Sequence, residues 1–533
     1  MDVSDIHEGL DKLGYVVGEA NPTYFYFIVD EGKYPPIWEY VVVRSMENVN
    51  SNDVEVMVVA QICEILSSSL ALDLSSKPRH EAVERIVKAG LVDRRILAKA
   101  RVLGFNYNGE VLQPRRAVHP GNEVYRAPSS VLKEFYSYPD SESLYIGSLI
   151  NRVDVPVSIS LKGFRRHLAI LAQTGAGKSY AAGVLLEELL KKGATAIVLD
   201  PHADHVFFSR SRSGGFYSKR VTVFRTPESS GRYNASDIGF LSTYEIKFSD
   251  LSVDEIATIC GIEERWMNII SAIRDALREL REQKGDSYSL EDLIKFLESN
   301  DDENYMRALK YVRKLQRINV FGDATTHILN ILKPKHTSII DLSGLDDEVS
   351  DYVAYRILND TFNVVKSQKY PYPVFIVIEE AHRFVPSKES TLSKGIIKRI
   401  AAEGRKFGLF LIIISQRPSK IDPDVLSQCN SQMILRITNP EDQEAVKRSS
   451  ERMSEDLLRD LPGLNIGEAV IVGEIVKAPV MVRIRSRETM EGGADIDVIS
   501  KLAEASREAE EGEKRLAELV IEERKRIKEL IEG

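Results

Sequence analysis

The segment from Leu168 to Tyr180, LAILAQTGAGKSY, contains most of a phosphate-binding loop. The usual pattern is G-x-x-x-x-G-K-[ST], and Gly177, Lys178 and Ser179 supply its second half. Alanine occupies position 172, where the pattern begins with glycine. An apolar run that predicts a strand precedes the loop and a helical pattern follows it, so backbone N–H groups at the start of the helix can bind an anion. The segment therefore predicts a nucleotide site.

The residue types in this loop indicate how a nucleotide would be held. Glycines permit the positive φ or the close approach that a loop of successive N–H groups needs. Lys178 supplies a positive charge for the β- and γ-phosphates, and Ser179 supplies a hydroxyl for Mg²⁺. The alternative is an ordinary strand–turn–helix in which the lysine occurs by chance. The predicted nucleotide-binding residues of the loop are Gly175, Ala176, Gly177, Lys178, Ser179 and Tyr180.

Two adjacent glutamates, Glu379 and Glu380, end the apolar run PVFIVIEE. Adjacent strand residues point to opposite faces, but the chain turns where the strand ends. Both side chains can then reach the carboxyl edge of the sheet, where ligands bind in open α/β folds. We expect Glu379 to serve Mg²⁺ through water and Glu380 to polarise the attacking water. The alternative is a solvated helix N-terminus, where glutamates favour the helix dipole.

Further polar and charged residues adjoin the predicted strands. Gln416 ends the strand FLIIISQ, where it can touch the γ-phosphate or the water, or else make an ordinary strand-end hydrogen bond. Asp200 ends the strand ATAIVLD and is a candidate carboxylate near Mg²⁺. Arg405 precedes the FLIIISQ strand, and Arg165 and Arg166 precede the phosphate-loop strand. Such an arginine can neutralise transition-state charge from its own or a neighbouring subunit, although each alone is more often a surface residue.

A basic segment follows Asp200 in the chain. Residues 206–225 hold five basic and no acidic residues around a flexible SGG. This segment can line a pore and contact DNA phosphates, or it can be a solvated loop. A second candidate, VPSKESTLSKGIIKR, follows the paired glutamates. Neither segment has a base-reading motif, so we expect sequence-independent binding. The candidate DNA contacts are Arg210, Arg212, Lys219 and Arg220 in the first segment and Lys388, Lys394 and Lys398 in the second.

The elements that must position these residues have the pattern of an α/β core. HLAILA, ATAIVLD, TSIIDLSG, VFIVIEE, FLIIISQ and MILRIT are apolar runs typical of buried strands, and helical patterns separate them. This alternation predicts a parallel sheet with helices on both faces, in the manner of a phosphate-loop ATPase. We assign the core to residues 151–495, with a helical insertion at 250–333.

The two ends of the chain differ from this core. Residues 1–150 carry short β-type runs separated by turn-rich pieces, which predicts a small sandwich or barrel. Residues 496–533 are rich in charge with spaced leucines and isoleucines, which predicts a long helix that is either solvated or packed on a partner.

Composition limits the class of protein. A chain of 533 residues is too long to fold around one hydrophobic core. Its content of 43% hydrophobic and 28% charged residues is typical of a soluble globular chain. A net charge of -9 argues against a basic coat for nucleic acid but leaves room for a local basic pore. No signal peptide, zinc-like cysteine spacing or apolar run of about 20 residues is present. We therefore expect a cytoplasmic protein with no membrane partner.

Taken in order, the motifs resemble the HerA family, the archaeal DNA translocases of the HerA/FtsK group. The resemblance covers about residues 140–490, and the β-rich N-terminal part is similar to that family's HAS barrel. Ala172 departs from the more usual glycine. The segments that carry the resemblance are RRHLAILAQTGAGKS, IVLDPHADH, VFIVIEEAHRFVP, EGRKFGLFLIIISQRPSKIDPDVLSQCNSQMILRITNPED and GEAVIVGEIVKAPVMVRI.

The resemblance implies a RecA-like ATPase that uses ATP and Mg²⁺ and works as a homohexameric ring around duplex DNA. It also implies a partnership with the nuclease NurA in resecting DNA ends during double-strand break repair. By position, Glu380 would be the catalytic base, Gln416 the γ-phosphate sensor and Arg405 the arginine finger. Further nucleotide contacts implied by position are Arg166, Arg483 and Ile484.

Two other kinds of function fit the same residues. One is a conjugation-type or protein-remodelling motor ATPase, although the lack of predicted membrane segments disfavours a membrane-anchored motor. The other is an NTP-binding switch that does not move along DNA. Stimulation of ATP hydrolysis by DNA would separate the translocase from the switch.

Overall fold

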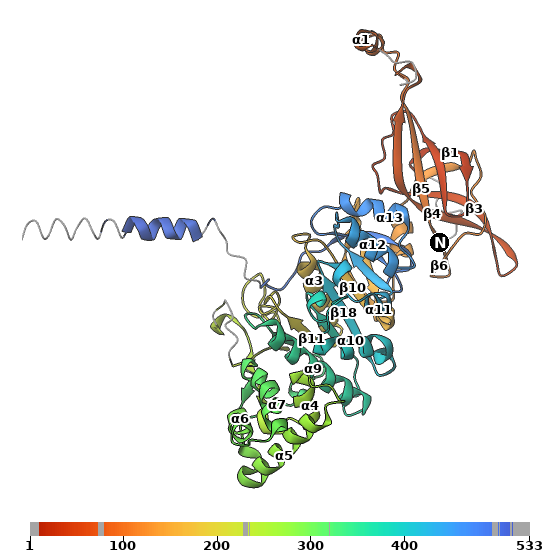
Figure 1. The fold of residues 1–533 in the computed structure, drawn as a ribbon. Helices are drawn as coiled ribbons and strands as arrows, with labels where there is room; N and C mark the ends of the chain where they lie inside the picture. The colour runs from red at the N-terminus through yellow and green to blue at the C-terminus, as the bar shows by residue number, and fades with distance from the viewer. Residues whose placement is uncertain are drawn as a thin grey trace, which may run out of the picture. The chain divides into compact units, whose positions relative to one another are not determined.

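The structure is a computed structural model, and it describes residues 10–72, 79–227, 233, 235–318, 320–492, 499, 501–511 and 514. The chain divides into two compact units, Met1–Glu491 and Gly492–Gly533. In the second unit residues 501–511 form an exposed helix, and most of the remaining predicted tail lies outside the described residues. Figure 1 shows the order of the elements along the chain.

A closed antiparallel barrel forms the N-terminal part of the first unit. Its strand order is β2-β1-β7-β3-β4-β5, and pairing of β2 with β5 closes it. Alternate residues of β2, such as Phe25 and Phe27, are fully buried inside, as expected for one covered face. The barrel that we considered beside a sandwich is confirmed. Its strands are β1 (Lys12–Ala20), β2 (Tyr24–Val29), β3 (Tyr40–Val49), β4 (Asn52–Ser68), β5 (Arg95–Tyr107) and β7 (Glu123–Arg126), with β6 (Glu110–Leu112) and helix α1 (His80–Lys88) attached.

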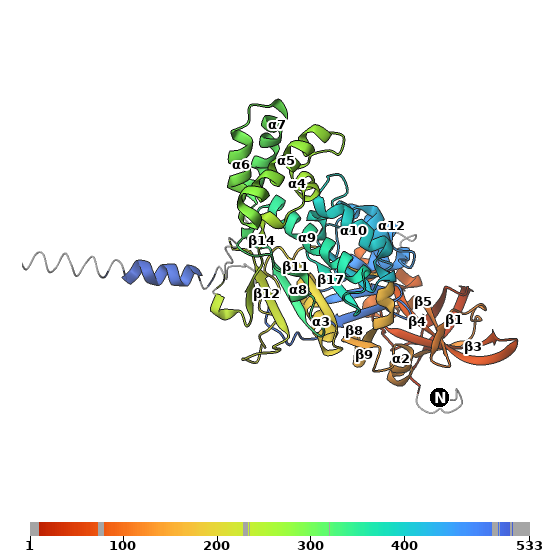
Figure 2. The ribbon, with the colours of Figure 1, turned by 90° about the horizontal axis from the view of Figure 1, so that it is seen from below.

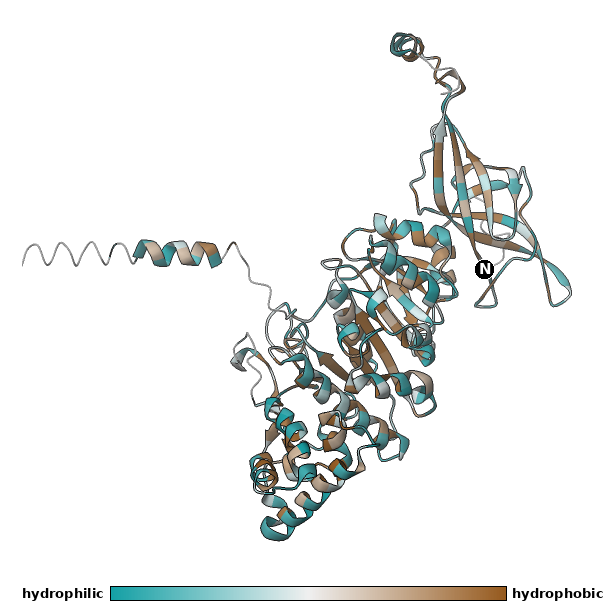
Figure 3. Cartoon of the chain, in the orientation of Figure 1, coloured by the Kyte–Doolittle hydropathy of each residue, from teal (hydrophilic) through white to brown (hydrophobic). Residues whose placement is uncertain are grey.

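A twelve-stranded sheet forms the core, in the order β13-β12-β16-β11-β17-β18-β10-β19-β20-β21-β8-β9. The strands from β13 to β19 are parallel and the others antiparallel. Apolar residues gather on the central strands in Figure 3, and the predicted parallel α/β core is confirmed. Its strands are β8 (Ser143–Leu149), β9 (Arg152–Ser160), β10 (Leu168–Leu171), β11 (Thr195–Asp200), β12 (Val221–Arg225), β13 (Leu241–Thr243), β16 (Thr337–Asp341), β17 (Val374–Ile378), β18 (Leu409–Ser415), β19 (Ser431–Ile434), β20 (Glu468–Val472) and β21 (Val480–Ile484).

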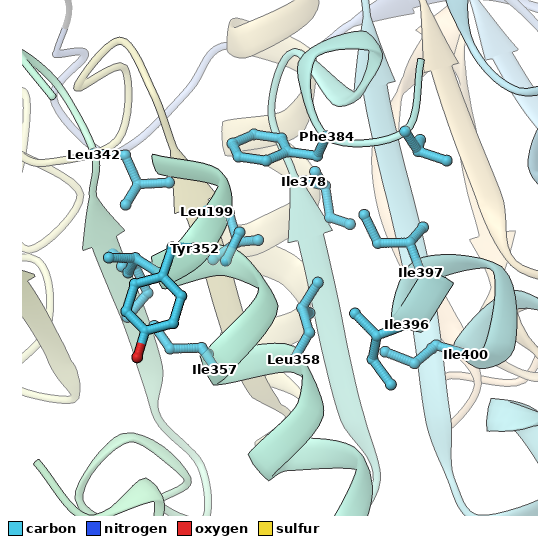
Figure 4. Packing of buried hydrophobic residues seen from close by; sticks show 14 of the residues in the cluster. Leu199, Leu342, Tyr352, Ile357, Leu358, Ile378, Phe384, Ile396, Ile397 and Ile400 are labelled. Carbon is cyan, nitrogen blue, oxygen red and sulfur yellow. The ribbon is translucent and has the colours of Figure 1, made fainter. Parts of the chain in front are cut away.

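Helices cover both faces of this sheet. Ile376 and Ile378 of β17 belong to one buried cluster, and the intervening Val377 belongs to the other. Figure 4 shows Leu358 of α9 and Ile397 of α10 packed beside Ile378; burial of each such side chain stabilises the fold by about 1.5–3 kcal/mol. The core helices are α2 (Ser129–Phe135), α3 (Lys178–Lys191), α9 (Asp347–Lys366), α10 (Leu392–Glu403), α11 (Pro423–Gln428), α12 (Pro440–Ser449) and α13 (Glu455–Asp460).

The segment predicted as a helical insertion folds as a helical group beside the sheet, which Figure 2 shows from a second direction. Capping boxes begin two of its helices: Ser252 with Glu255, and Ser289 with Asp292. These caps satisfy N–H groups that the first turn leaves unpaired. The short strands β14 (Ile246–Lys247) and β15 (Phe321–Gly322) pair at its base. Its α-helices within the described residues are α4 (Val253–Cys260), α5 (Met267–Lys284), α6 (Leu290–Glu298), α7 (Glu303–Val312) and α8 (Ile328–Ile331).

A buried polar junction joins the barrel to the core. Arg101 of β5 donates to Asp460 at 2.8 Å and to Gln61 at 2.7 Å, and the arginine and aspartate side chains are only 8% and 7% exposed. Strands β8 and β9 belong to the core sheet, so the predicted boundary at residue 150 falls in the hairpin between them. Within the described part of the chain, no helix has both the length and the apolar character needed to cross a membrane.

Candidate nucleotide site

The phosphate loop connects β10 to α3. Gly175 has φ 75° and Gly177 has φ 99°, a backbone conformation that side chains disfavour. Gly177 is the N-cap residue directly before α3, which begins at Lys178, so the helix N-terminus faces the loop. Ala172 is fully buried at the strand end, where its N–H donates to the carbonyl of Ser415. Its φ is not positive, and alanine therefore meets no backbone penalty at this position.

Lys178 lies between the two glutamates predicted from the sequence. Its Nζ is 2.8 Å from Oε1 of Glu380 and 3.7 Å from Oε2 of Glu379. Burial lowers the pKa of Lys178, but the nearby charges of Glu379 and Glu380 outweigh burial and raise it above its ordinary value. The lysine is therefore charged, and it lies closer to Glu380 than to Glu379.

Glu380 is held in its ionised form. Burial opposes ionisation, but His382, whose Nδ1 lies 3.2 Å from Oε2 of Glu380, and the charge of Lys178 lower the pKa of Glu380 to about 2. Its backbone has φ 47°, which is rare outside glycine. This left-handed turn directly after β17 explains how two adjacent residues both face Lys178 instead of opposite sides of the sheet.

Glu379 has a partner that the sequence did not reveal. Oε1 of Glu379 lies 2.9 Å from Nε2 of His205, and both side chains are buried. Its other oxygen accepts no hydrogen bond among the described residues. A buried carboxylate oxygen without a hydrogen bond is costly, so Glu379 retains an open position for a donor or a metal-bound water.

The structure places Asp204, not Asp200, against the loop hydroxyl. Ser179 Oγ donates to Oδ2 of Asp204 at 2.6 Å. Asp200 is fully buried, and its two oxygens accept the backbone N–H groups of Asp204 and His205 at 3.0 and 2.8 Å. Burial raises the pKa of Asp200 to about 7. Asp200 thus shapes the turn that carries Asp204; the run DPHADH at a strand end was the available signal for this second carboxylate.

These groups fit a magnesium ion bound together with a nucleotide. Mg²⁺ in such sites keeps several waters and takes one or two carboxylates plus phosphate oxygens. The Ser179 hydroxyl, Asp204 and the open oxygen of Glu379 supply that kind of donor set. The described residues contain no group of three His, Cys, Asp or Glu side chains that would enclose a metal by itself, so the nucleotide would have to complete the site.

Gln416 meets the phosphate loop directly. Thr174 Oγ1 donates to Oε1 of Gln416 at 2.6 Å, which connects the end of β18 to the loop. Thr174 is exposed and was not singled out from the sequence. The structure therefore brings the predicted γ-phosphate sensor to the predicted phosphate site.

Strand β21, which carries the predicted nucleotide contacts Arg483 and Ile484, connects to the loop through Gly467. Gly467 donates its N–H to the carbonyl of Ala176 at 3.2 Å and accepts from Ile484 at 2.9 Å. Arg483 is exposed and pairs with the buried Glu468 at 3.2 Å. Ile466 beside them is 68% exposed and is a further candidate contact. Tyr180, in contrast, has its hydroxyl occupied by the N–H of Arg487 at 2.7 Å.

Arg166 and Arg405 lie at the opposite edge of the sheet from the phosphate loop. Both are exposed, in 3-10 turns that precede β10 and β18. These two strands are parallel, so their amino ends share one edge. β18 has seven residues, and a rise of about 3.3 Å per residue separates Arg405 from Gln416 by roughly 20 Å. Neither arginine is brought to the phosphate loop of its own chain.

The first candidate DNA segment is partly engaged within the chain. Arg210 donates to the carbonyl groups of Asp237 and Ser236 at 2.9 and 3.2 Å, and Arg212 lies 3.7 Å from Glu491. Lys219 and Arg220 are exposed, and no side-chain ion pair to a described residue holds them. These two residues are therefore available to a phosphate backbone.

In the second candidate segment, two of the three candidate lysines are paired with aspartates of the same chain. Lys394 and Lys398 lie 3.3 and 3.4 Å from Asp422, and Lys398 also lies 2.7 Å from Asp424. Lys388 is exposed. Sequence patterns did not reveal these partners because the acids lie far along the chain.

Comparison with known proteins decides the family. A model of the HerA helicase central domain matches residues 144–361. The DNA double-strand break repair helicase HerA of Sulfurisphaera tokodaii is 30% identical over 94% of this chain and 98% of its own length. The chain belongs to the HerA family.

Other members of the HerA family match over similar lengths. The Pyrococcus furiosus DNA double-strand break repair helicase HerA is 29% identical over 90% of this chain and 93% of its own. A probable helicase of Methanocaldococcus jannaschii is 30% identical over 91% and 93%. Among solved structures, VirB4 of Thermoanaerobacter pseudethanolicus has 16% identity and a TM-score of 0.46, covering 66% of this chain and 98% of that one.

Proposed function

We propose that this HerA-family chain is an ATP-driven, Mg²⁺-dependent translocase of duplex DNA that works as a hexameric ring and resects broken DNA ends with the nuclease NurA. The observation that supports this proposal most strongly is the contact of Lys178 with Glu379 and Glu380. This contact brings a phosphate-binding group and the proposed water-activating groups into one site. The names of the relatives, which are DNA repair helicases, support the choice of DNA as the track.

We propose that ATP binding transfers Lys178 from the glutamates to the β- and γ-phosphates. Loss of that neighbouring cation raises the pKa of Glu380, which makes it a better base. Glu380 then accepts a proton from water while the water oxygen bonds to the γ-phosphorus and the bond to the β-phosphate oxygen breaks. Gln416, held beside the loop by Thr174, orients the water or the γ-phosphate.

Magnesium, when bound, would supply positive charge that offsets the negative charge of the phosphates. We propose that Ser179 and Asp204 hold it, with Glu379 acting through water. The hydroxyl of Ser179 would then turn from Asp204 toward the ion, and His205 keeps Glu379 oriented. This role of Asp204 leads to a measurable dependence on Mg²⁺.

Replacing Asp204 by asparagine should raise the Mg²⁺ concentration needed for half-maximal ATP hydrolysis by about 10–100-fold, the usual cost of losing a group that orients a metal site. The measurement is a Mg²⁺ titration of steady-state turnover. Asp154→Asn is the matched control, because Asp154 also accepts a serine hydroxyl, that of Ser129, at a distant surface. Equal Mg²⁺ dependence in both variants would remove Asp204 from the metal site.

We propose that Arg405 and Arg166 act on the ATP of a neighbouring subunit. Their place at the amino ends of β18 and β10 puts them too far from their own phosphate loop. A head-to-tail ring repeats one interface and can bring the amino edge of one subunit to the carboxyl edge of the next. The geometry therefore favours a ring over a monomeric switch.

We also propose that the chain has three parts, which are the N-terminal barrel, the ATPase core and the C-terminal tail. In this proposal the barrel supplies the surface that binds NurA. Because β8 pairs with β21 in the core sheet, removal of the barrel must stop before Ser143. A truncation at residue 150 would also take away a core strand, and its failure would say nothing about NurA.

Replacing Lys219 and Arg220 by alanine should weaken duplex binding about equally for every sequence. The slope of log affinity against log salt should fall by about 1 for each phosphate that the variant no longer neutralises, while basal ATP hydrolysis survives. A salt titration of duplex binding measures this. The matched control is Lys310→Ala with Arg317→Ala, which removes the same charge from exposed positions of the helical insertion. A slope equal to that of the control would show that the Lys219–Arg220 pair is only solvated.

A further inference from the structure

His167 connects the two turns that carry the arginines. It directly follows Arg166 and begins the approach to β10. Its Nδ1 accepts the N–H of Leu411 in β18 at 3.0 Å, and its Nε2 lies 3.0 Å from the carbonyl oxygen of Ala401 near the end of α10. Since Nδ1 accepts, Nε2 carries the proton and donates to Ala401. One buried imidazole thus bonds to both elements that flank Arg405.

The backbone at His167 is held in an unusual conformation. Its φ is 56° and its ψ is 166°, a combination that is uncommon for residues other than glycine. The side chain is only 2% exposed. The neighbouring backbone is also fixed, because Asn430 donates its N–H to the carbonyl of Arg166 at 3.0 Å. The two ring bonds and the bond to the Arg166 carbonyl hold this strained backbone in place.

The His167 ring is neutral because of its surroundings. Burial, opposed by the Ala401 bond and assisted by the charge of Arg405, lowers the pKa of His167 to about 4. The imidazole is therefore neutral at neutral pH. The ring therefore adds no charge beside Arg166 and Arg405, and it acts through its two hydrogen bonds.

We propose that His167 is a positioning residue that joins the Arg166 turn and the Arg405 turn, so that one subunit presents both arginines to the ATP of its neighbour in fixed geometry. This inference rests on the proposed function, in which the arginines act between subunits. His167 itself is buried, with both ring nitrogens bonded inside its own chain, so it touches no nucleotide.

The chain offers a pair of substitutions that separate the two bonds. In His167→Asn the amide oxygen lies close to the position of Nδ1 and can still accept from Leu411, but the side chain is too short to reach Ala401. In His167→Gln the longer amide can reach Ala401. The buried His336, which bonds to Thr222 at 2.9 Å on another strand of the sheet, provides the matched control His336→Asn.

His167→Asn should lower kcat for ATP by about 10–100-fold, because a displacement of about 1 Å in a reacting group has an effect of that size. KM for ATP should change little, since the phosphate loop is untouched. His167→Gln should retain more of the wild-type kcat than His167→Asn, and His336→Asn should retain all of it. A wild-type kcat in His167→Asn would overturn the proposal.

Mixed rings give a readout that a general loss of folding would not. Subunits with His167→Asn keep an intact nucleotide site, and subunits with Glu380→Gln keep intact arginines. Mixed in equal amounts, they should recover about a quarter of wild-type turnover, because one neighbour pair in four joins a good site to good arginines. Arg405→Ala mixed with Glu380→Gln is the benchmark.

The two mixtures separate failure of this inference from failure of the proposed function. Recovery in both supports the positioning role. Recovery with Arg405→Ala but not with His167→Asn overturns the positioning role and leaves the function standing. Recovery in neither mixture would show that the arginines do not act between subunits, which overturns that part of the proposed function and the inference with it.

Discussion

Replacing Glu380 by glutamine should stop ATP hydrolysis while leaving ATP bound. The amide has the shape of the carboxylate but cannot accept the proton of the attacking water, and loss of a general base lowers turnover by about 10²–10⁴-fold. The loop N–H groups and Lys178 remain, and the lysine is freed from one of its two carboxylate partners. Single-turnover hydrolysis and equilibrium binding of ATP measure the two quantities separately.

Glu379→Gln is the matched comparison, one residue away. Because Glu379 faces His205 and is proposed to act through a metal-bound water, this variant should shift the Mg²⁺ dependence more than the limiting rate. If Glu380→Gln lost nucleotide binding while Glu379→Gln remained fully active, the roles assigned to the two glutamates would be reversed.

Replacing Arg405 by alanine should lower the rate of ATP hydrolysis by about 10³–10⁵-fold, the range for removal of an arginine finger. Binding of ATP should persist, because Arg405 lies at the far edge of the sheet from its own phosphate loop. Steady-state turnover and ATP affinity are the measurements. The exposed neighbour Lys406 supplies the control variant Lys406→Ala, which should retain wild-type turnover; equal losses in the two variants would point to a damaged turn.

Much of the fold was predictable because the core strands are buried on both faces. Continuous apolar runs such as VFIVI and FLIII are the pattern of central parallel strands, and they fold as β17 and β18. The end of the barrel was harder to place. β8 alternates like a barrel strand, and only its pairing with β21, more than 300 residues later in the chain, assigns it to the core.

The candidate site was predictable in residue type but not in geometry. The GKS run and the paired glutamates follow strands, so their meeting at one sheet edge follows from topology. The left-handed backbone of Glu380, which turns both carboxylates toward Lys178, has no sequence signal because glycine is absent there. The Ser179–Asp204 bond and the internal partners of Arg210 depend on loop conformations, which local periodicity does not encode.

The separation of Arg405 from its own phosphate loop, in contrast, follows from strand direction alone. A residue before a parallel strand lies at the edge opposite the residue after it. Arg405 and Gln416 flank the same strand, so Arg405 lies away from the phosphate loop of its own chain. His167 was not singled out, because a histidine between arginines and a strand has no distinctive pattern; its two bonds appear only once β10 and β18 are side by side.

ATP-dependent displacement of a third strand from a triplex on duplex DNA tests the proposed translocase most directly, because displacement requires movement along the duplex. The wild-type chain should displace the third strand with ATP and Mg²⁺, and Glu380→Gln should bind the DNA without displacing it. Displacement that is absent in the wild-type chain while duplex DNA is bound and ATP is hydrolysed would contradict a DNA translocase and leave an ATPase that acts on another polymer or as a switch.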